Sequence, residues 1–238
     1  MVQGQGFVGD TFGNPVDGLL IAQSIERKES LKRRPLTPEE LKRFIHDPAF
    51  QRERVARPER WWIVWLGLYA GLRREEAAQL RVDQVIQDAA SGVWYLDVTD
   101  TGEGQRLKNA ASRRRVPLHA SLIGPLGFLD YFAKVKKGKH TRLFYQCKPS
   151  ANGYGDAVGK WFSYRRDVLE FPEEVVFHSF RHGFITGLHA ASVPDQLVFA
   201  LCGHTGSGGE VHLGYTHRES FPLKTLSEAV NKLDFGVV

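Results

Sequence analysis

The sequence has little cysteine and no long apolar run. Only two cysteines, Cys147 and Cys202, occur in 238 residues, far apart and without a partner motif. This excludes a disulfide framework and argues against a cysteine-based zinc site. The longest apolar stretch, Trp61 to Leu72, is broken by glycines and falls short of the roughly eighteen residues that a membrane span needs. The N-terminus also lacks the basic-then-apolar order of a secretory signal. We therefore expect a cytoplasmic protein that does not use a membrane.

The charge balance is positive. Lysine and arginine outnumber aspartate and glutamate by 32 to 27, which gives a formal charge of +5 and an isoelectric point near 9.2. Such a balance favours a polyanionic partner, although many proteins without one are equally basic. Two basic stretches, Arg113 to Arg115 and Lys134 to Lys139, suggest a basic surface.

A sharp helix start divides the chain. The first 34 residues begin with a Gly-rich stretch and end in the basic run Lys32, Arg33 and Arg34. Thr37 can then cap a helix whose third residue, Glu40, completes a capping box. We predict a flexible tail or linker over residues 1–34 and one domain over residues 35–238.

The domain alternates between helical and strand patterns. A tryptophan-rich helix over 58–71 is apolar around most of its circumference, which predicts a central core helix. Short β-rich segments between 84 and 118 predict a small antiparallel sheet of about three strands. Further helices are expected at 121–135, 157–169, 179–191, 194–201 and 223–233. The fold class is α+β and mainly α. The apolar stripe of the last helix fits either docking on a neighbouring protomer or packing on its own domain.

The first segment that suggests chemistry is Gly71-Leu72-Arg73. A buried helix ends at Gly71, and Arg73 follows where the next helix begins. This would hold a guanidinium rigidly at a surface turn, with Glu76 placed to orient it. An exposed helix-capping arginine is the competing interpretation.

The second segment is His178-Ser179-Phe180-Arg181-His182. If Ser179 opens a helix, His178, Arg181 and His182 lie on neighbouring turns of one face. Arginine supplies a forked pair of donors for a phosphate, and histidine can also move a proton. Zinc binding by the two histidines is disfavoured, because the intervening arginine would repel a cation and no glutamate stands in the metalloprotease position.

The third segment runs from Leu201-Cys202-Gly203-His204 through a Gly-rich loop to Gly214-Tyr215-Thr216-His217. We expect the loop to hold Tyr215 on a mobile tether. Any single tyrosine is usually structural, so the interest of this one depends on its neighbours.

Taken in this order, the segments resemble the tyrosine recombinase (phage integrase) family over roughly residues 35–218. Arg73 and Glu76 match the family's "TGLR-xx-E" turn, and the second segment matches its "H-x-x-R-H" box. Cys202-Gly203-His204 matches its "LGH" box, and Tyr215-Thr216-His217 its "Y-x-H" nucleophile. The family's hairpin lysine precedes a basic strand ending in "VPL", and Lys108 precedes such a strand here. Arg106 lies close by as an alternative.

The resemblance implies a recombinase catalytic domain that cuts and rejoins double-stranded DNA through a 3′-phosphotyrosine, without metal or other cofactor. Arg73, Arg181 and His204 would stabilise the transition state, Tyr215 would attack, Lys108 would protonate the leaving 5′-oxygen, and His178 would assist proton transfer. His182 is expected to brace the fold. A tetramer on DNA is implied, with a monomer left open for the isolated chain. A type IB topoisomerase, an inactive DNA-binding relative and a zinc hydrolase stay as alternatives.

The sequence departs from the family in three respects. The loop between His204 and Tyr215 is slightly longer and richer in glycine than usual, and Cys202 replaces the common residue before the glycine. Relatives usually carry an N-terminal helical domain that clamps DNA from the opposite face, and residues 1–34 are too short for one.

Overall fold

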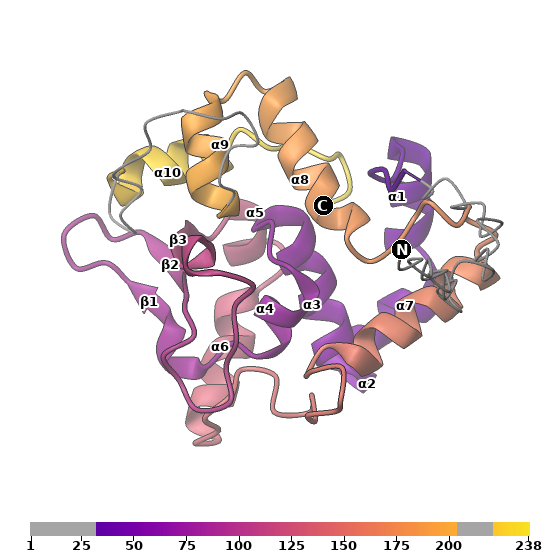
Figure 1. Ribbon diagram of the computed structural model, residues 1–238, viewed down its shortest axis with the longest axis horizontal. Coiled ribbons are helices and arrows are strands. Elements are labelled where there is room, and N and C mark those ends of the chain that lie inside the picture. Colours follow the sequence, from indigo (N-terminus) through magenta and orange to yellow (C-terminus); the bar gives the residue numbers. More distant parts are fainter. Residues whose placement is uncertain (1–31, 204–220) are drawn as a thin grey trace, which may run out of the picture. The chain divides into compact units, whose positions relative to one another are not determined.

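The computed structural model describes residues 32–203 and 221–238. Contacts divide the chain into residues 1–32 and a compact unit over residues 33–238, and the fold of this second unit is shown in Figure 1. Its helices are α1 (Pro38–Ile45), α2 (Pro48–Ala56), α3 (Pro58–Tyr69), α4 (Arg74–Ala78), α5 (Ala120–Ile123), α6 (Phe128–Lys137), α7 (Asp156–Val168), α8 (Ser179–Ala190), α9 (Asp195–Cys202) and α10 (Leu223–Val230). Strands β1 (Val85–Gln87), β2 (Trp94–Val98) and β3 (Arg114–Pro117) complete the regular structure, together with short 3₁₀ turns at Val82–Gln84 and Ala110–Ser112.

The first helix begins as its sequence predicts. The Thr37 hydroxyl accepts a hydrogen bond from the Glu40 amide at 3.2 Å, and the Glu40 carboxylate accepts one from the Thr37 amide at 2.8 Å. Two donors that the helix itself cannot satisfy are thereby paired. Sequence patterns did not predict the next helix, α2, in which Asp47 caps and Pro48 occupies the first turn.

Helix α3 forms the centre of the core, as predicted. Trp61 and Trp65 are 2% and 1% exposed, and the Trp61 ring stacks on Phe50 with centroids 4.8 Å apart. The helix contacts α2, α4, α5 and α8. It stops at Gly71, whose φ of 61° favours glycine. The Phe184 ring fills the space that a Cβ at Gly71 would need, so both conformation and packing require the glycine.

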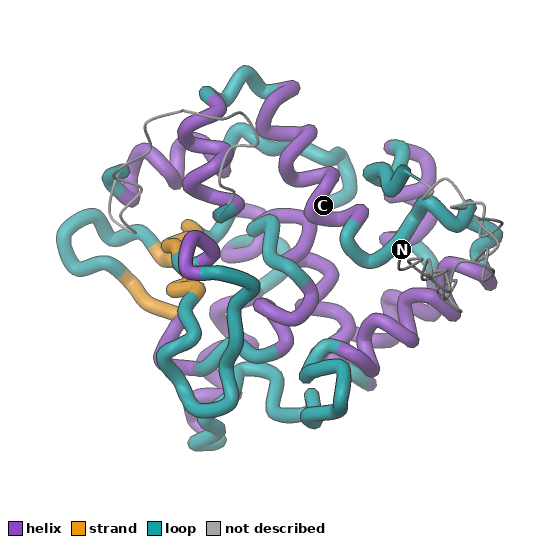
Figure 2. Tube along the Cα trace, in the orientation of Figure 1, coloured by secondary structure: helices purple, strands orange, loops and turns teal. Residues whose placement is uncertain are grey.

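The sheet has three antiparallel strands in the order β1-β2-β3, which confirms the predicted fold class. Its central strand pairs Leu96 with Val85 on one side and with Val116 on the other. These three side chains are buried, so one face of the small sheet belongs to the core. The strands are drawn in orange in Figure 2, surrounded by helices and loops.

Helix α10 packs on its own domain. It contacts β3 and α9, and Leu226, Ala229 and Val230 are at most 4% exposed within the main core. Leu233, just after the helix, is buried with them. The apolar stripe is therefore covered by the same chain, as the self-packing alternative predicts. Among the described helices, none is long and apolar enough to cross a membrane.

Candidate active site

Arg73 caps the N-terminus of α4 and is held by a carboxylate. Its Nη1 donates to Glu76 Oε1 at 2.6 Å, and its amide donates to Glu76 Oε2 at 2.9 Å. A further bond joins Nη1 to the Ser112 hydroxyl at 3.3 Å. The guanidinium is 21% exposed, so it is fixed in position while still open to a ligand. Glu76 orients Arg73 as the sequence suggested.

Arg181 lies in α8 with only 1% of its side chain exposed. Its Nη1 donates to the Gly71 carbonyl, and its Nη2 donates to the Cys202 carbonyl at 2.5 Å. Its buried Nε has no hydrogen-bond partner. Burial and the nearby Arg114 lower the Arg181 pKa to about 10, so the group stays charged at neutral pH. The Gly71 bond ties Arg181 to the turn that carries Arg73.

A third arginine, Arg114, belongs to the same cluster and was missed in the sequence. Its Nε donates to the Leu201 carbonyl at 2.7 Å, and its Nη1 and Nη2 donate to the two Glu76 carboxylate oxygens at 3.2 and 2.8 Å. Only 3% of the side chain is exposed, so its placement on a basic surface was wrong. The reason is the period of the strand: along β3, Arg114 and Val116 are buried while Arg115 between them is partly exposed. A buried arginine on a strand needs a carboxylate partner. That requirement was the signal that could have identified Arg114 from the sequence.

Glu76 holds the three arginines together. Its carboxylate is 4% exposed and bonded to Arg73 and Arg114, and it lies 4.0 Å from Arg181. Burial opposes ionisation of the carboxyl group, but the charge and hydrogen bonds of Arg114, with the charges of Arg73 and Arg181, outweigh burial and lower its pKa to about 2. Glu76 is therefore a permanent anion at physiological pH.

His178 and His182 lie at the start of α8. Their rings meet nearly at right angles, with centroids 4.8 Å apart. Burial, His182 and Arg181 lower the His178 pKa to about 4, and burial and Arg181 lower that of His182. At neutral pH His178 is uncharged and can accept a proton. Over residues 32–203 and 221–238, no group of three or more His, Cys, Asp or Glu residues is arranged to hold a metal ion.

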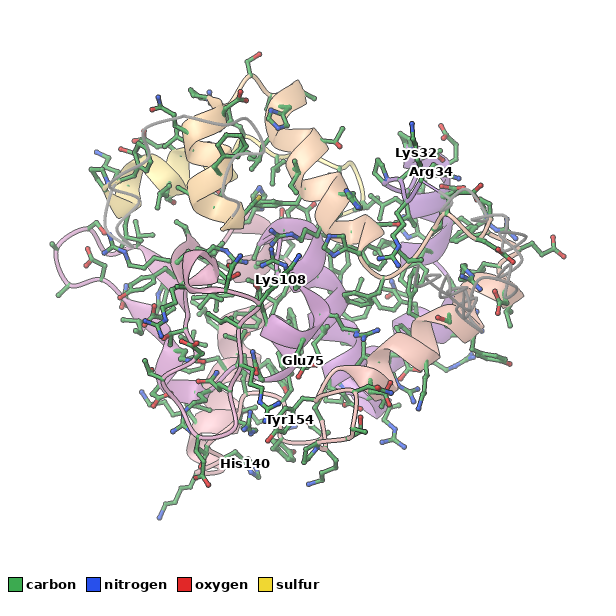
Figure 3. All side chains as sticks on the ribbon, viewed as in Figure 1. Lys32, Arg34, Glu75, Lys108, His140 and Tyr154 are labelled. Carbon is green, nitrogen blue, oxygen red and sulfur yellow. The ribbon has the colours of Figure 1, made fainter. Side chains whose placement is uncertain are left out.

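One pocket brings several of the predicted residues together. It has a volume of about 680 Å³ and is lined by basic groups from separate segments, among them Arg73, Lys108 and His178. Lys108 comes from the segment between β2 and β3 and is exposed (Figure 3). Arg106 lines a different pocket, and its backbone amide and carbonyl bond to the Gln79 side chain at 2.9 and 2.6 Å. The geometry thus favours Lys108 over Arg106.

The remaining two predicted residues, His204 and Tyr215, lie outside the described residues. The described chain before them ends at Gly203, which closes α9 with a φ of 63°. Arg114 holds the Leu201 carbonyl and Arg181 holds the Cys202 carbonyl. The two buried guanidinium groups therefore fix the end of α9 immediately before His204.

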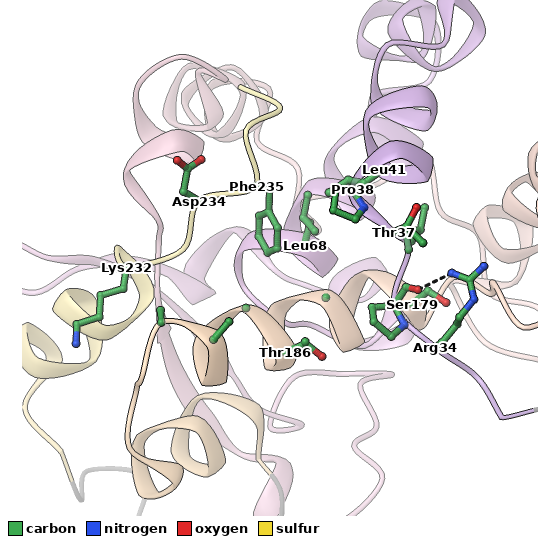
Figure 4. Close-up of a pocket in the computed structure, with 16 residues that line it drawn as sticks. Arg34, Thr37, Pro38, Leu41, Leu68, Ser179, Thr186, Lys232, Asp234 and Phe235 are labelled. Carbon is green, nitrogen blue, oxygen red and sulfur yellow. Dashed lines mark hydrogen bonds between the residues drawn. The ribbon is translucent and has the colours of Figure 1, made fainter.

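A second pocket is different in character. It has a volume of about 630 Å³ and is lined by apolar groups from α1, α3, α8 and the C-terminal residues, including Leu41, Leu68 and Phe235 (Figure 4). Of the predicted catalytic residues that the structure describes, Arg73, Lys108, His178 and Arg181, none lines this pocket. Its chemistry gives no reason to place a phosphate there.

Comparison with known proteins identifies the family. The profile of the phage integrase family matches residues 34–220. The chain belongs to the phage integrase family. Among solved structures, the integrase from mycobacterium phage Brujita is similar, with a TM-score of 0.53 and 18% identity, over 85% of this chain and 58% of that one. The XerH site-specific recombinase, solved bound to difH substrate, has a TM-score of 0.50 and 22% identity, over 74% of this chain and 48% of that one.

At these identities the two structures show the fold alone. This family member spans about half the length of each. A comparison with curated proteins gave no match.

Proposed function

We propose that the chain is the catalytic part of a site-specific recombinase that breaks and rejoins DNA through Tyr215. One observation supports this most strongly: Arg73, Lys108 and His178 line a single pocket, and Glu76 connects Arg73 to the buried Arg181. A cationic pocket backed by fixed arginines suits the charge that builds on a phosphodiester under attack. Family membership and the fold favour recombination over the topoisomerase alternative.

In the proposed reaction, the Tyr215 oxygen attacks the scissile phosphorus and the bond from phosphorus to the 5′-oxygen breaks. The tyrosine proton passes toward His178, which is neutral at pH 7 because its pKa is lowered to about 4. Lys108 gives a proton to the departing 5′-oxygen. A 3′-phosphotyrosine results, and attack by a 5′-hydroxyl reverses the step. The ester retains the bond energy, so rejoining needs no ATP.

Arg73 and Arg181 would contact the non-bridging oxygens, with His204 as a further donor. Arg73 keeps an exposed face for this contact. Arg181 uses one donor on each Nη for a backbone carbonyl, and its Nε is unbonded, so three of its five N–H groups have no partner among the described residues. On DNA we propose a tetramer, and in the cell a cytoplasmic location.

A covalent adduct tests this function. The full chain is incubated with nicked suicide duplexes drawn from the sequences that flank its gene, in EDTA and in Mg²⁺. We expect a protein–DNA adduct in both buffers, joined through Tyr215 to a 3′-phosphate. Tyr215→Phe should abolish the adduct and keep DNA binding, since only one hydroxyl is lost. An adduct that persists in Tyr215→Phe, or that forms only with added metal, would overturn the proposal.

A further inference from the structure

Arg74, next to Arg73, is a half-buried cation without a partner in the part of the chain that the structure describes. It opens α4 and lines the same pocket as Lys108 and His178. Within residues 32–203 and 221–238 it makes no hydrogen bond or ion pair, and its Nε is buried and unbonded. A guanidinium that is partly removed from water normally gains a carboxylate or a phosphate in exchange. Arg73 has such a partner in Glu76, whereas Arg74 has none.

Helix α7 provides a slot for this side chain. A Cβ at Gly159 would overlap the Arg74 guanidinium, and a Cβ at Gly155 would lie 3.0 Å from its Cγ. Gly159 is in the interior of α7, where glycine costs about 1 kcal/mol relative to alanine. Because Gly159 has no side chain, the Arg74 guanidinium can lie directly against the α7 backbone. The glycine also lowers the stability of α7.

The surrounding charges leave the slot open to an anion. Arg33 and Lys108 line the pocket, are exposed, and have no bonded partner among the described residues. Glu75, the one acidic residue among the described residues of the lining, accepts hydrogen bonds from the amides of Tyr154 and Gly155 at 2.7 and 2.8 Å. Its carboxylate is thus bound to the backbone at the start of α7, and among the described residues it forms no ion pair with Arg74. Figure 3 labels Glu75, Tyr154 and Lys108.

We propose that Arg74 binds a second DNA phosphate, beside the one held by Arg73, and that Gly159 provides the slot for this contact. The inference rests on the proposed recombinase function. Arg73 and Arg74 are consecutive residues with side chains in one pocket, so the two phosphates would be neighbours on one strand. Arg74 would position the DNA and take no part in the bond changes. A structural arginine that only packs its stem on α7 is the competing role.

A double-mutant cycle separates the two roles. Binding of the full chain to a random duplex of about thirty base pairs is measured by fluorescence anisotropy over a range of salt. We expect Arg74→Ala to weaken binding about tenfold at roughly 100 mM salt and to reduce the salt slope by about one. Gly159→Ala should weaken binding in the same direction, because the new methyl group displaces the guanidinium. The double variant should bind no more weakly than Arg74→Ala, since both changes remove one contact.

Stability and charge provide the controls. Gly159→Ala should melt at the same or a higher temperature than the wild type, because alanine favours the helix. Arg52→Ala removes the same charge from an exposed position on α2 outside the pocket, and should change the slope less. Equal slopes for wild type and Arg74→Ala would overturn the inference, as would an equal loss in Arg52→Ala. If the loss of binding in the double variant equals the sum of the two single losses, Gly159 does not act through the Arg74 contact, and its part in the inference fails.

The outcome is distinguishable from failure of the proposed function. If wild type forms the Tyr215 adduct while the Arg74 variants bind DNA unchanged, only this inference fails. If the Arg74 variants lose a phosphate contact but no nicked substrate yields an adduct in EDTA or Mg²⁺, the phosphate site stands without the recombinase chemistry. A wild type that does not bind the duplex at low salt would contradict both.

Discussion

The guanidinium of Arg114 meets the carboxylate of Glu76 through two parallel hydrogen bonds, of 3.2 and 2.8 Å, in a site where each side chain is less than 5% exposed. The pair joins strand β3 to helix α4, and through the Leu201 carbonyl it also reaches the end of α9. Three segments far apart in the sequence are thus fixed to one another at the point where the predicted catalytic groups meet. The same contacts hold Arg73 and Arg181, the two arginines that we propose contact the scissile phosphate.

Glu76→Gln should destabilise the domain strongly. The change is nearly isosteric, but it removes the only acidic partner described for Arg114 and leaves buried guanidinium groups uncompensated. Removing one member of such a buried pair costs about 3–5 kcal/mol. Urea unfolding at pH 7, followed by tryptophan fluorescence, measures the loss. Glu39→Gln, at an exposed position in α1, is the control and should cost less than about 0.5 kcal/mol. Equal stabilities for the two variants would contradict the assignment.

Acid should remove the stabilisation that Glu76 provides. Its pKa falls from 4.5 to about 2 on folding, so the unfolded chain binds the proton more readily. The contribution is complete above pH 4.5 and is lost as the pH falls toward 2. The difference in unfolding free energy between wild type and Glu76→Gln should therefore shrink over that window. A difference that stays constant from pH 6 to 3 would show that the carboxylate does not titrate as the structure implies.

His178 should affect the unfolding free energy at higher pH than Glu76 does. Burial and its cationic neighbours lower its pKa from 6.5 to about 4, so the unfolded state again binds the proton first. Stability contributed by neutral His178 is complete above pH 6.5 and is lost as the pH falls to 4. His178→Asn should flatten the stability profile between these values. A His178→Asn variant that keeps the wild-type slope between pH 6.5 and 4 would contradict this prediction.

Lys108→Ala should slow DNA cleavage and be rescued by a better leaving group. A duplex with sulfur in place of the scissile 5′-oxygen releases a thiolate, which needs no general acid. Single-turnover adduct formation on oxygen and sulfur substrates measures the effect. We expect a loss of about a hundredfold on the oxygen substrate and near wild-type rates on the sulfur one. If the sulfur substrate does not restore the rate, Lys108 is not the acid, and Arg106→Ala is the next variant to measure.

Leu226→Ala should destabilise the domain by about 2–5 kcal/mol, because this α10 side chain is 4% exposed and contributes to the main core. Lys224→Ala, at an exposed position in the same helix, should have little effect. Thermal unfolding of the two variants provides the comparison. If Leu226→Ala is as stable as the wild type, the result would instead favour contact of α10 with a neighbouring protomer.

Much of the fold was predictable because local rules and packing agree. The capping box at Thr37, the apolar helix α3 and the alternating strand β2 each carry their own signal, and each forms where it was predicted. Helix α2 was missed because its apolar content is low: Phe50 is its one buried residue, and Val55 is 89% exposed. Sequence periodicity cannot predict a helix whose place depends on one aromatic anchor.

The site was predictable in part. The family resemblance implied that Arg73, Lys108 and His178 belong together, and all three line one pocket. Arg114 was missed because three consecutive arginines look alike in sequence, and only the pairing of β3 decides which one faces Glu76. The proposed roles of His204 and Tyr215 remain predictions, since both lie outside the described residues.

The arginine cluster has a consequence for the free protein. Three guanidinium charges, on Arg73, Arg114 and Arg181, surround one carboxylate, Glu76, so the cluster carries an excess of two positive charges in a largely buried site. An enclosed charge imbalance opposes folding, and a bound phosphate would reduce it. The proposed DNA substrate would then also be a folding ligand, whose binding would add RT ln(1 + [DNA]/Kd) to the free energy of unfolding. The proposed DNA complex would then resist unfolding better than the free protein.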